Sequence, residues 1–209
     1  MYQVKILTKD NSRPEPINER LITTEVSWTV YGGPKKAIVK AYGRIENLIK
    51  YTRYLRNPIE IINGKTEKVW WGYINKITIF YENIQMIIDI KNLFNHIIVQ
   101  YHNPLDPGGN LEKKETDPAE DKNSQEKYGI KKLIVNRENI NEELAEIIRD
   151  AKLKEHSKIK TKLENRNGVE TIILIECEGW FGTLEWGNYE NTEGFIVNTD
   201  GPGVFEFAN

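Results

Sequence analysis

The stretch KVWWGYINKITIFY, residues 68–81, decides the fold that we expect, because nearly every side chain on it is large, β-branched or aromatic. Side chains of a β-strand alternate between the two faces of a sheet. Both faces of this stretch are apolar, with Val69, Trp71, Tyr73, Ile77 and Ile79 on one and Trp70, Ile74 and Phe80 on the other. Such a pattern is typical of a strand covered on two sides, as in a small barrel or a sandwich. The glycine at its centre, Gly72, indicates a point where the strand coils or another backbone comes close.

Alternating apolar residues and turn signals predict further strands on both sides of this stretch. Residues 24–31 and 36–42 are expected to form a hairpin around Gly32-Gly33-Pro34, since glycine permits a positive φ and proline cannot donate a ladder hydrogen bond. Asn63-Gly64 and Asn167-Gly168 are further hairpin signals. The other expected strands are residues 2–8, 59–62, 85–90, 96–101, 130–135, 158–163, 169–178, 195–197 and 204–207.

In two places the period changes from two to about 3.6, which predicts amphipathic helices. The first covers residues 45–55, ends before Asn57-Pro58, and has its apolar side at Ile45, Leu48, Ile49, Thr52 and Leu55. The second follows a capping-box-like pair, Asn139 and Glu142, and runs for roughly four turns. Its apolar stripe consists of Ile140, Leu144, Ile147, Ile148 and Ala151.

The sequence therefore predicts an α+β, β-rich fold of small antiparallel β-barrel units with two short to medium helices packed on them. Residues 103–127 contain three prolines, Gly108-Gly109 and many charges, but few apolar side chains. We therefore expect a β-barrel-like domain at 1–102, an extended loop or arm at 103–127, and a second β-rich unit with one helix at 128–209.

Composition narrows the classes of function. The formal net charge of −2 over 209 residues disfavours direct, sequence-specific nucleic-acid binding. The single cysteine, Cys177, cannot form an internal disulfide. No signal peptide is evident, and no apolar run approaches the roughly 20 residues that span a bilayer, so no membrane anchor is expected.

The five tryptophans, Trp28, Trp70, Trp71, Trp180 and Trp186, allow two interpretations. Aromatic rings can stack on sugars, but they more often serve cores and subunit contacts, which is our default prediction. His96, His102 and His156 lack the spacing of metal ligands.

Acidic residues near the end of the chain are candidates for acid–base chemistry. Glu176 and Glu178 share a strand face on either side of Cys177, and Glu185 follows soon after. A β-rich surface of this charge content produces such pairs by chance, and Cys177 at the end of an apolar strand predicts an inert buried thiol. We predict no catalytic residue, metal ligand or cofactor.

Four segments resemble virion proteins of tailed bacteriophages from the tail tip or baseplate hub. They are VSWTVYGGPKKAIVKAYG at 26–43, NPIEIINGKTEKVWWGYINKI at 57–77, DPAEDKNSQEKYGIKK at 117–132 and CEGWFGTLEWGNY at 177–189. The resemblance implies a non-enzymatic structural subunit of hub-like β-barrels, located in the virion after assembly in the host cytoplasm. It implies a homo-oligomeric ring that contacts other tail or baseplate proteins.

The positions that match this resemblance are expected to determine the fold or the interfaces. They are Trp28, Gly32, Gly33, Pro34, Trp70, Trp71, Gly72, Tyr128, Gly129, Trp180, Thr183, Leu184 and Trp186. Because the chain stops at Asn209, we expect no attached cell-wall hydrolase or receptor-binding module. Two alternatives stay open, namely a glycan-binding module that uses exposed tryptophans and a hydrolase that uses Glu176, Glu178 or Glu185.

Overall fold

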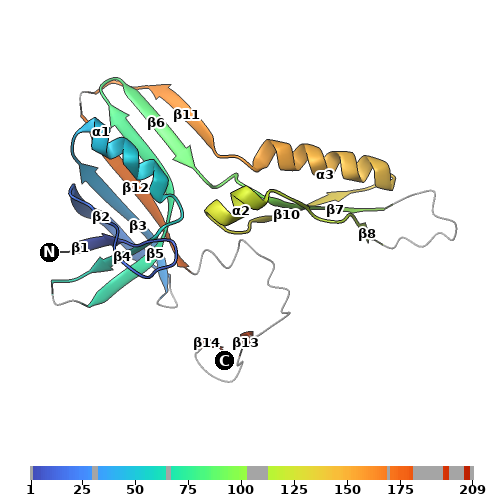
Figure 1. The fold of residues 1–209 in the computed structure, drawn as a ribbon, viewed down its shortest axis with the longest axis horizontal. Helices are drawn as coiled ribbons and strands as arrows, with labels where there is room; N and C mark the ends of the chain where they lie inside the picture. Colours follow the sequence, from blue (N-terminus) through green and yellow to red (C-terminus); the bar gives the residue numbers. More distant parts are fainter. Residues whose placement is uncertain are drawn as a thin grey trace.

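The computed structural model describes residues 2–29, 33–64, 67–102, 113–168 and 170–180, and the backbone of two short strands that pair with each other. These two strands are β13 (Phe195–Val197) and β14 (Phe205–Phe207). Most of the described chain belongs to a curled antiparallel sheet and to a smaller unit beside it (Figure 1). The α+β, β-rich fold predicted from the sequence is therefore confirmed.

The large sheet has the strand order β1-β4-β5-β12-β3-β2, and β6 and β11 extend it beside β5. Its strands are β1 (Gln3–Ile6), β2 (Arg20–Trp28), β3 (Pro34–Tyr42), β4 (Pro58–Ile62), β5 (Lys68–Tyr81), β6 (Ile84–Asp89), β11 (Lys160–Asn165) and β12 (Ile172–Gly179). The small sheet consists of β7 (His96–Tyr101), β8 (Lys114–Glu115), β9 (Ala119–Glu120) and β10 (Lys132–Arg137). The helices are α1 (Ile45–Leu48), the 3-10 helix η1 (Ile49–Tyr54), α2 (Lys122–Tyr128) and α3 (Glu142–His156).

A bulge interrupts β5, the central strand of the large sheet. Along β12, Glu176 pairs with Lys76, but the next residue, Cys177, pairs with Ile74. Asn75 is therefore an extra residue in β5, and such a residue bends a strand and shifts the alternation of its side chains.

The bulge changes which side chains of β5 share a face. Trp70, Ile74, Ile77 and Ile79 all belong to one buried cluster inside the curled sheet. Our prediction that Trp70 and Ile74 face away from Ile77 and Ile79 was wrong, because it assumed unbroken alternation. The opposite face is not fully covered, since Trp71 is 40% exposed.

The predicted helix over residues 45–55 is present, but its buried side differs from the expected one. Only its first part is α-helical, and the rest is the 3-10 helix η1, in which side chains three residues apart share a face. Leu48, Tyr51 and Tyr54 therefore point into the core. Ile49, which a period of 3.6 places on that side, is 50% exposed.

The small unit is inserted into the large sheet. Its strands and helices lie between β6 and β11, which pair with each other, and this ribbon leads from the large sheet toward α3 (Figure 1). β7 and β10 are parallel, and α3 packs on β7. The strands therefore do not divide as we expected at residues 102 and 128, because β7 belongs to the small sheet while β11 and β12 belong to the large one.

Part of the expected arm forms strands and a helix. β8 and β9 pair with β7, and α2 follows them. Residues 103–112 lie outside the described part of the chain. Among the described residues, no helix is both long enough and apolar enough to cross a membrane.

The long helix α3 begins two residues later than the capping-box pattern predicts. The N-cap is Asn141, whose Oδ1 accepts a hydrogen bond from the backbone N–H of Leu144 at 3.0 Å. Asn139 instead has a positive φ of 57° in the preceding turn. Asparagine suits both positions, because it caps helices and tolerates left-handed backbone.

The buried side of α3 is also rotated relative to the prediction. Ala145 is fully buried in the core of the small unit, and Ile148 and Leu153 pack against that core. Leu144 and Ile147, which we expected to be buried, are 44% and 58% exposed. The apolar side chains of the helix therefore extend beyond the face that packs on the small sheet.

Candidate functional site

Two tryptophans are exposed at one end of the large sheet. Trp28, at the end of β2, pairs with Pro34 and is 46% exposed. Gly179 of β12 lies against Pro34, since a Cβ on this glycine would stand 1.8 Å from the Pro34 carbonyl oxygen. Gly179 pairs with Gly72, the neighbour of Trp71 on β5. Trp28 and Trp71 therefore mark the same end of four adjacent strands, which we call the aromatic end.

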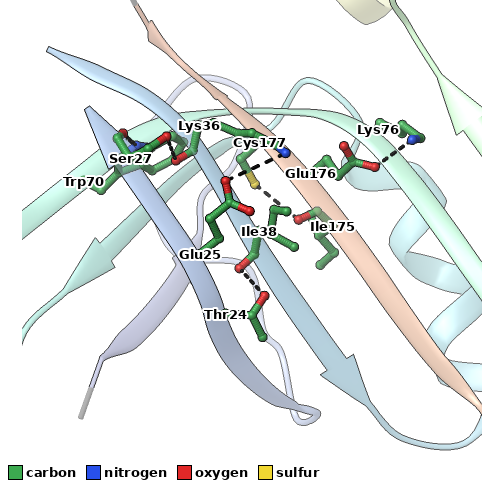
Figure 2. Close-up of polar contacts among 10 residues, drawn as sticks. All are labelled: Thr24, Glu25, Ser27, Lys36, Ile38, Trp70, Lys76, Ile175, Glu176 and Cys177. Carbon is green, nitrogen blue, oxygen red and sulfur yellow. Dashed lines mark hydrogen bonds and ion pairs between the residues drawn. The ribbon is translucent and has the colours of Figure 1, made fainter. Parts of the chain in front are cut away.

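The third tryptophan of this region is part of the core. Trp70 is fully buried, and its Nε1–H donates to the carbonyl oxygen of Ser27 at 3.3 Å (Figure 2). A Cβ on Gly72 would stand 2.1 Å from the Glu178 carbonyl oxygen and 2.6 Å from the Trp70 ring. Gly72 is thus required by a close backbone approach, as its place in the strand suggested, and Trp70 belongs to the buried core.

The turn before β3 is closed by reciprocal hydrogen bonds. The N–H of Thr29 donates to the Gly33 carbonyl oxygen at 2.7 Å, and the N–H of Gly33 donates to the Thr29 hydroxyl at 3.0 Å. Gly33 and Pro34 are buried, and β2 and β3 form the predicted hairpin. Gly32 lies outside the described residues.

Tyr128 and Gly129 join the small unit to the large sheet. Tyr128 packs against the large core, and its carbonyl oxygen accepts a hydrogen bond from Arg56 Nε at 2.8 Å. Gly129 follows α2 with a φ of +77°, which favours glycine. The structure therefore brings these two candidates to a junction between the units, where Tyr128 bonds to Arg56, 72 residues earlier in the sequence.

Two buried polar residues organise this junction, and we did not single them out from the sequence. Asn95 is fully buried, donates to the Gly129 carbonyl oxygen at 2.9 Å, and accepts from the N–H of Lys131 at 2.8 Å. The Nζ of Lys131 donates to the Ile90 carbonyl oxygen at 2.8 Å and lies 5.1 Å from the centre of the Phe94 ring. In sequence, Asn95 resembles an ordinary turn residue.

A cavity of about 570 Å³ lies at the junction, where β5, β6, β10 and β12 approach each other. Its lining mixes four lysines with three carboxylates. The lining residues are Asn75, Lys76, Asp89, Ile90, Lys91, Phe94, Lys131, Lys132, Glu176 and Glu178. None of these lining residues is a tryptophan.

The predicted pair of acids does face one space. Glu176 and Glu178 both line the junction cavity, as their shared strand face predicted. Glu176 Oε1 forms an ion pair with Lys76 at 2.7 Å (Figure 2), so a cation faces its carboxylate. Burial, together with the nearby charge of Arg56, lowers the pKa of the Lys131 ammonium to about 8. Glu185 lies outside the described residues.

Cys177 and the histidines have structural surroundings. Cys177 is buried, and burial raises the pKa of its thiol, which suppresses the reactive thiolate. His96 Nδ1 lies 2.9 Å from Glu120 Oε1, while His156 Nδ1 lies 3.1 Å from the Asn92 carbonyl oxygen. Within the described residues, no three histidine, cysteine or acidic side chains gather as a metal site would require.

The closing segment is only partly covered by the structure. Trp180 is the last described residue before the terminal strands, and Thr183, Leu184 and Trp186 lie outside the described residues. No protein-family model, curated protein or solved structure matches this chain.

Proposed function

We propose that this chain is a structural component of a tailed-phage virion, a tail or baseplate hub protein that self-assembles into a ring and contacts other tail proteins. Two lines of support lead to this proposal. One is the resemblance of four segments to tail-tip and baseplate proteins. The other, which carries it, is the exposure of Trp28 and Trp71 at the same end of the large sheet.

The physical chemistry of this end favours contact with protein. Tryptophan is enriched at the centres of protein interfaces, where its large apolar surface leaves water. β2, which ends at Trp28, pairs with β3 alone in the described part of the chain. β1 contacts β2 without pairing with it, so backbone donors and acceptors of β2 that β1 does not cover are groups to which a neighbouring chain can add.

Sedimentation velocity over a concentration series, with negative-stain imaging of the largest species, tests the proposal. We expect concentration-dependent oligomers that include closed rings, and a weaker association for Trp71→Ala. Tyr81→Ala is the matched control, because Tyr81 is 39% exposed at the opposite end of the same strand. Equal effects of the two substitutions, or a wild-type chain that stays monomeric both alone and with tail proteins, would contradict the proposal.

The same two tryptophans support a second candidate, a glycan-binding module. Indole rings at one end of a sheet can stack on the apolar faces of sugars. Titration with cell-surface glycans should then shift tryptophan fluorescence in wild type and in Tyr81→Ala, but much less in Trp71→Ala. An unchanged spectrum would remove this candidate. The carboxylate-dependent hydrolase has less support, because Lys76 pairs with Glu176.

A further inference from the structure

The helix α3 carries an apolar stripe that the small sheet leaves uncovered. Leu144 is 44% exposed and Ile147 is 58% exposed, and Ala151 is exposed as well. Positions separated by three and four residues lie on one side of a helix, so these three side chains form a continuous stripe. The rest of the exposed side of α3 is charged. This apolar stripe is therefore the part of the helix against which a second helix can pack.

Two residues of opposite charge lie beside this stripe, one near each end of the helix. Glu143 and Lys154 are both exposed, and eleven residues separate them, which is about three helical turns. They therefore lie on the same side of the stripe, with the acid near the helix N-terminus and the base near its C-terminus. Neither residue belongs to an ion pair among the described residues, whereas Lys152 and Glu155 on the other side pair with each other at 2.7 Å.

We propose that α3 pairs antiparallel with α3 of a second copy of this chain, stripe against stripe, so that Glu143 of each copy faces Lys154 of the other. An antiparallel two-fold arrangement puts the same flank of both helices together and forms this ion pair twice. A parallel arrangement would instead put like ends together, and the two helix dipoles would point the same way side by side, which is unfavourable.

The contact deepens the proposed self-assembly, but it is a different surface from the aromatic end. A 15-residue helix spans about 22 Å, so two such helices bury less area than a standard stable interface. The α3 contact alone therefore gives a weak dimer. In a ring held by the aromatic end, it would be strengthened by effective concentration and would join two rings through two-fold axes.

Charge exchange provides the test, with sedimentation velocity of the full chain as the measurement. Glu143→Lys and Lys154→Glu each place like charges together twice in the dimer, and each should weaken dimerisation by about tenfold. An equimolar mixture of the two variants restores both attractive pairs and should recover the wild-type dimer. The double variant Glu143→Lys/Lys154→Glu should recover it too, whereas Ile147→Asp should lose the α3 dimer.

Leu163→Asp is the control for a charge on an exposed apolar position elsewhere, since Leu163 on β11 is 68% exposed. It should leave the dimer intact, and circular dichroism should show the same fold for every variant. Repeating the series in a Trp71→Ala background separates this contact from the proposed ring. A monomeric wild type, or a mixture that associates no better than its components, overturns the α3 pairing. Loss of the Trp71 effect alone instead counts against the ring.

Discussion

The indole N–H of Trp70 donates to the main-chain carbonyl oxygen of Ser27 across the interior of the large sheet, at 3.3 Å. The two residues belong to β5 and β2, strands that do not pair with each other. The bond therefore connects the centre of the sheet to the strand at its end. It stabilises the curl, because flattening the sheet would break this bond and would also expose the fully buried ring.

Replacing Trp70 by phenylalanine tests this connection. The substitution leaves the carbonyl oxygen of Ser27, which lies at a partly buried position, without this donor and creates a void beside the remaining ring. We expect the free energy of unfolding to fall by about 2–4 kcal/mol, measured by urea denaturation. Trp71→Phe is the matched control and should change it by less than about 1 kcal/mol, because that ring is 40% exposed. Similar losses for both variants would show that the Trp70 bond has no special role.

Gly72→Ala should destabilise the same region. The new methyl group would stand 2.1 Å from the Glu178 carbonyl oxygen, so β5 and β12 would have to separate. We expect a loss of at least about 2 kcal/mol in the free energy of unfolding, or failure to fold. Gly168→Ala is the comparison, since its nearest contact is the movable guanidinium of Arg166. Thermal unfolding of the two variants measures the difference, and equal melting temperatures would contradict the expected contact.

Sequence patterns were sufficient for most strands, for the β2–β3 and β4–β5 hairpins and for the fold class, because these depend on local alternation and turn chemistry. The hairpin expected at Asn167-Gly168 was wrong, because β11 pairs with β6 while β12 pairs with β3 and β5. Sequence patterns also failed where a local departure changes the period. The extra residue Asn75 shifts the alternation along β5, and the 3-10 geometry of η1 replaces Ile49 with Tyr51 on the buried side. The residue types at these positions do not indicate either change, because both depend on packing between segments that are distant in sequence.

The insertion of the small unit could not be predicted from local sequence patterns either. Pairing of β6 with β11 joins segments about 75 residues apart, and nothing in either strand specifies its partner. The candidate site was predictable only in part. Exposed Trp71 and buried Trp70 are neighbours with the same chemistry, and the structure alone separates their roles. Asn95 was missed because its hydrogen-bond partners come from another part of the chain.

Asn95→Ala should loosen the junction between the two units. It removes a donor to the partly buried Gly129 carbonyl oxygen and an acceptor for the buried Lys131 N–H, and it leaves both groups without these partners. We expect a loss of about 2–4 kcal/mol in the free energy of unfolding. Asn136→Ala, at an exposed position, should cost less than about 0.5 kcal/mol. Hydrogen exchange should show faster opening at α2 in Asn95→Ala, and protection equal to wild type would contradict this role.

The last prediction concerns the pH dependence of stability at Lys131. Burial first, and the nearby charge of Arg56 second, lower the pKa of this ammonium from its ordinary 10.5 to about 8. Below pH 8 both the folded and the unfolded chain carry the proton, and the cost of burying the charge is fully present. Between pH 8 and 10.5 the unfolded chain binds more protons than the folded one. The contribution of Lys131 to the free energy of unfolding therefore rises with pH across this window.

Urea denaturation at pH 7, 8, 9 and 10 measures this contribution as the difference between wild type and Lys131→Met. We expect the difference to move in favour of wild type as the pH rises above 8, because methionine has no proton to lose. Lys132→Met, at the adjacent and less buried position, controls for the loss of a lysine from the cavity lining. An NMR titration of the Lys131 side chain in the folded protein gives the midpoint directly. A midpoint near 10.5, or a difference that is independent of pH, would show that the amine is not held in the buried position that lowers its pKa.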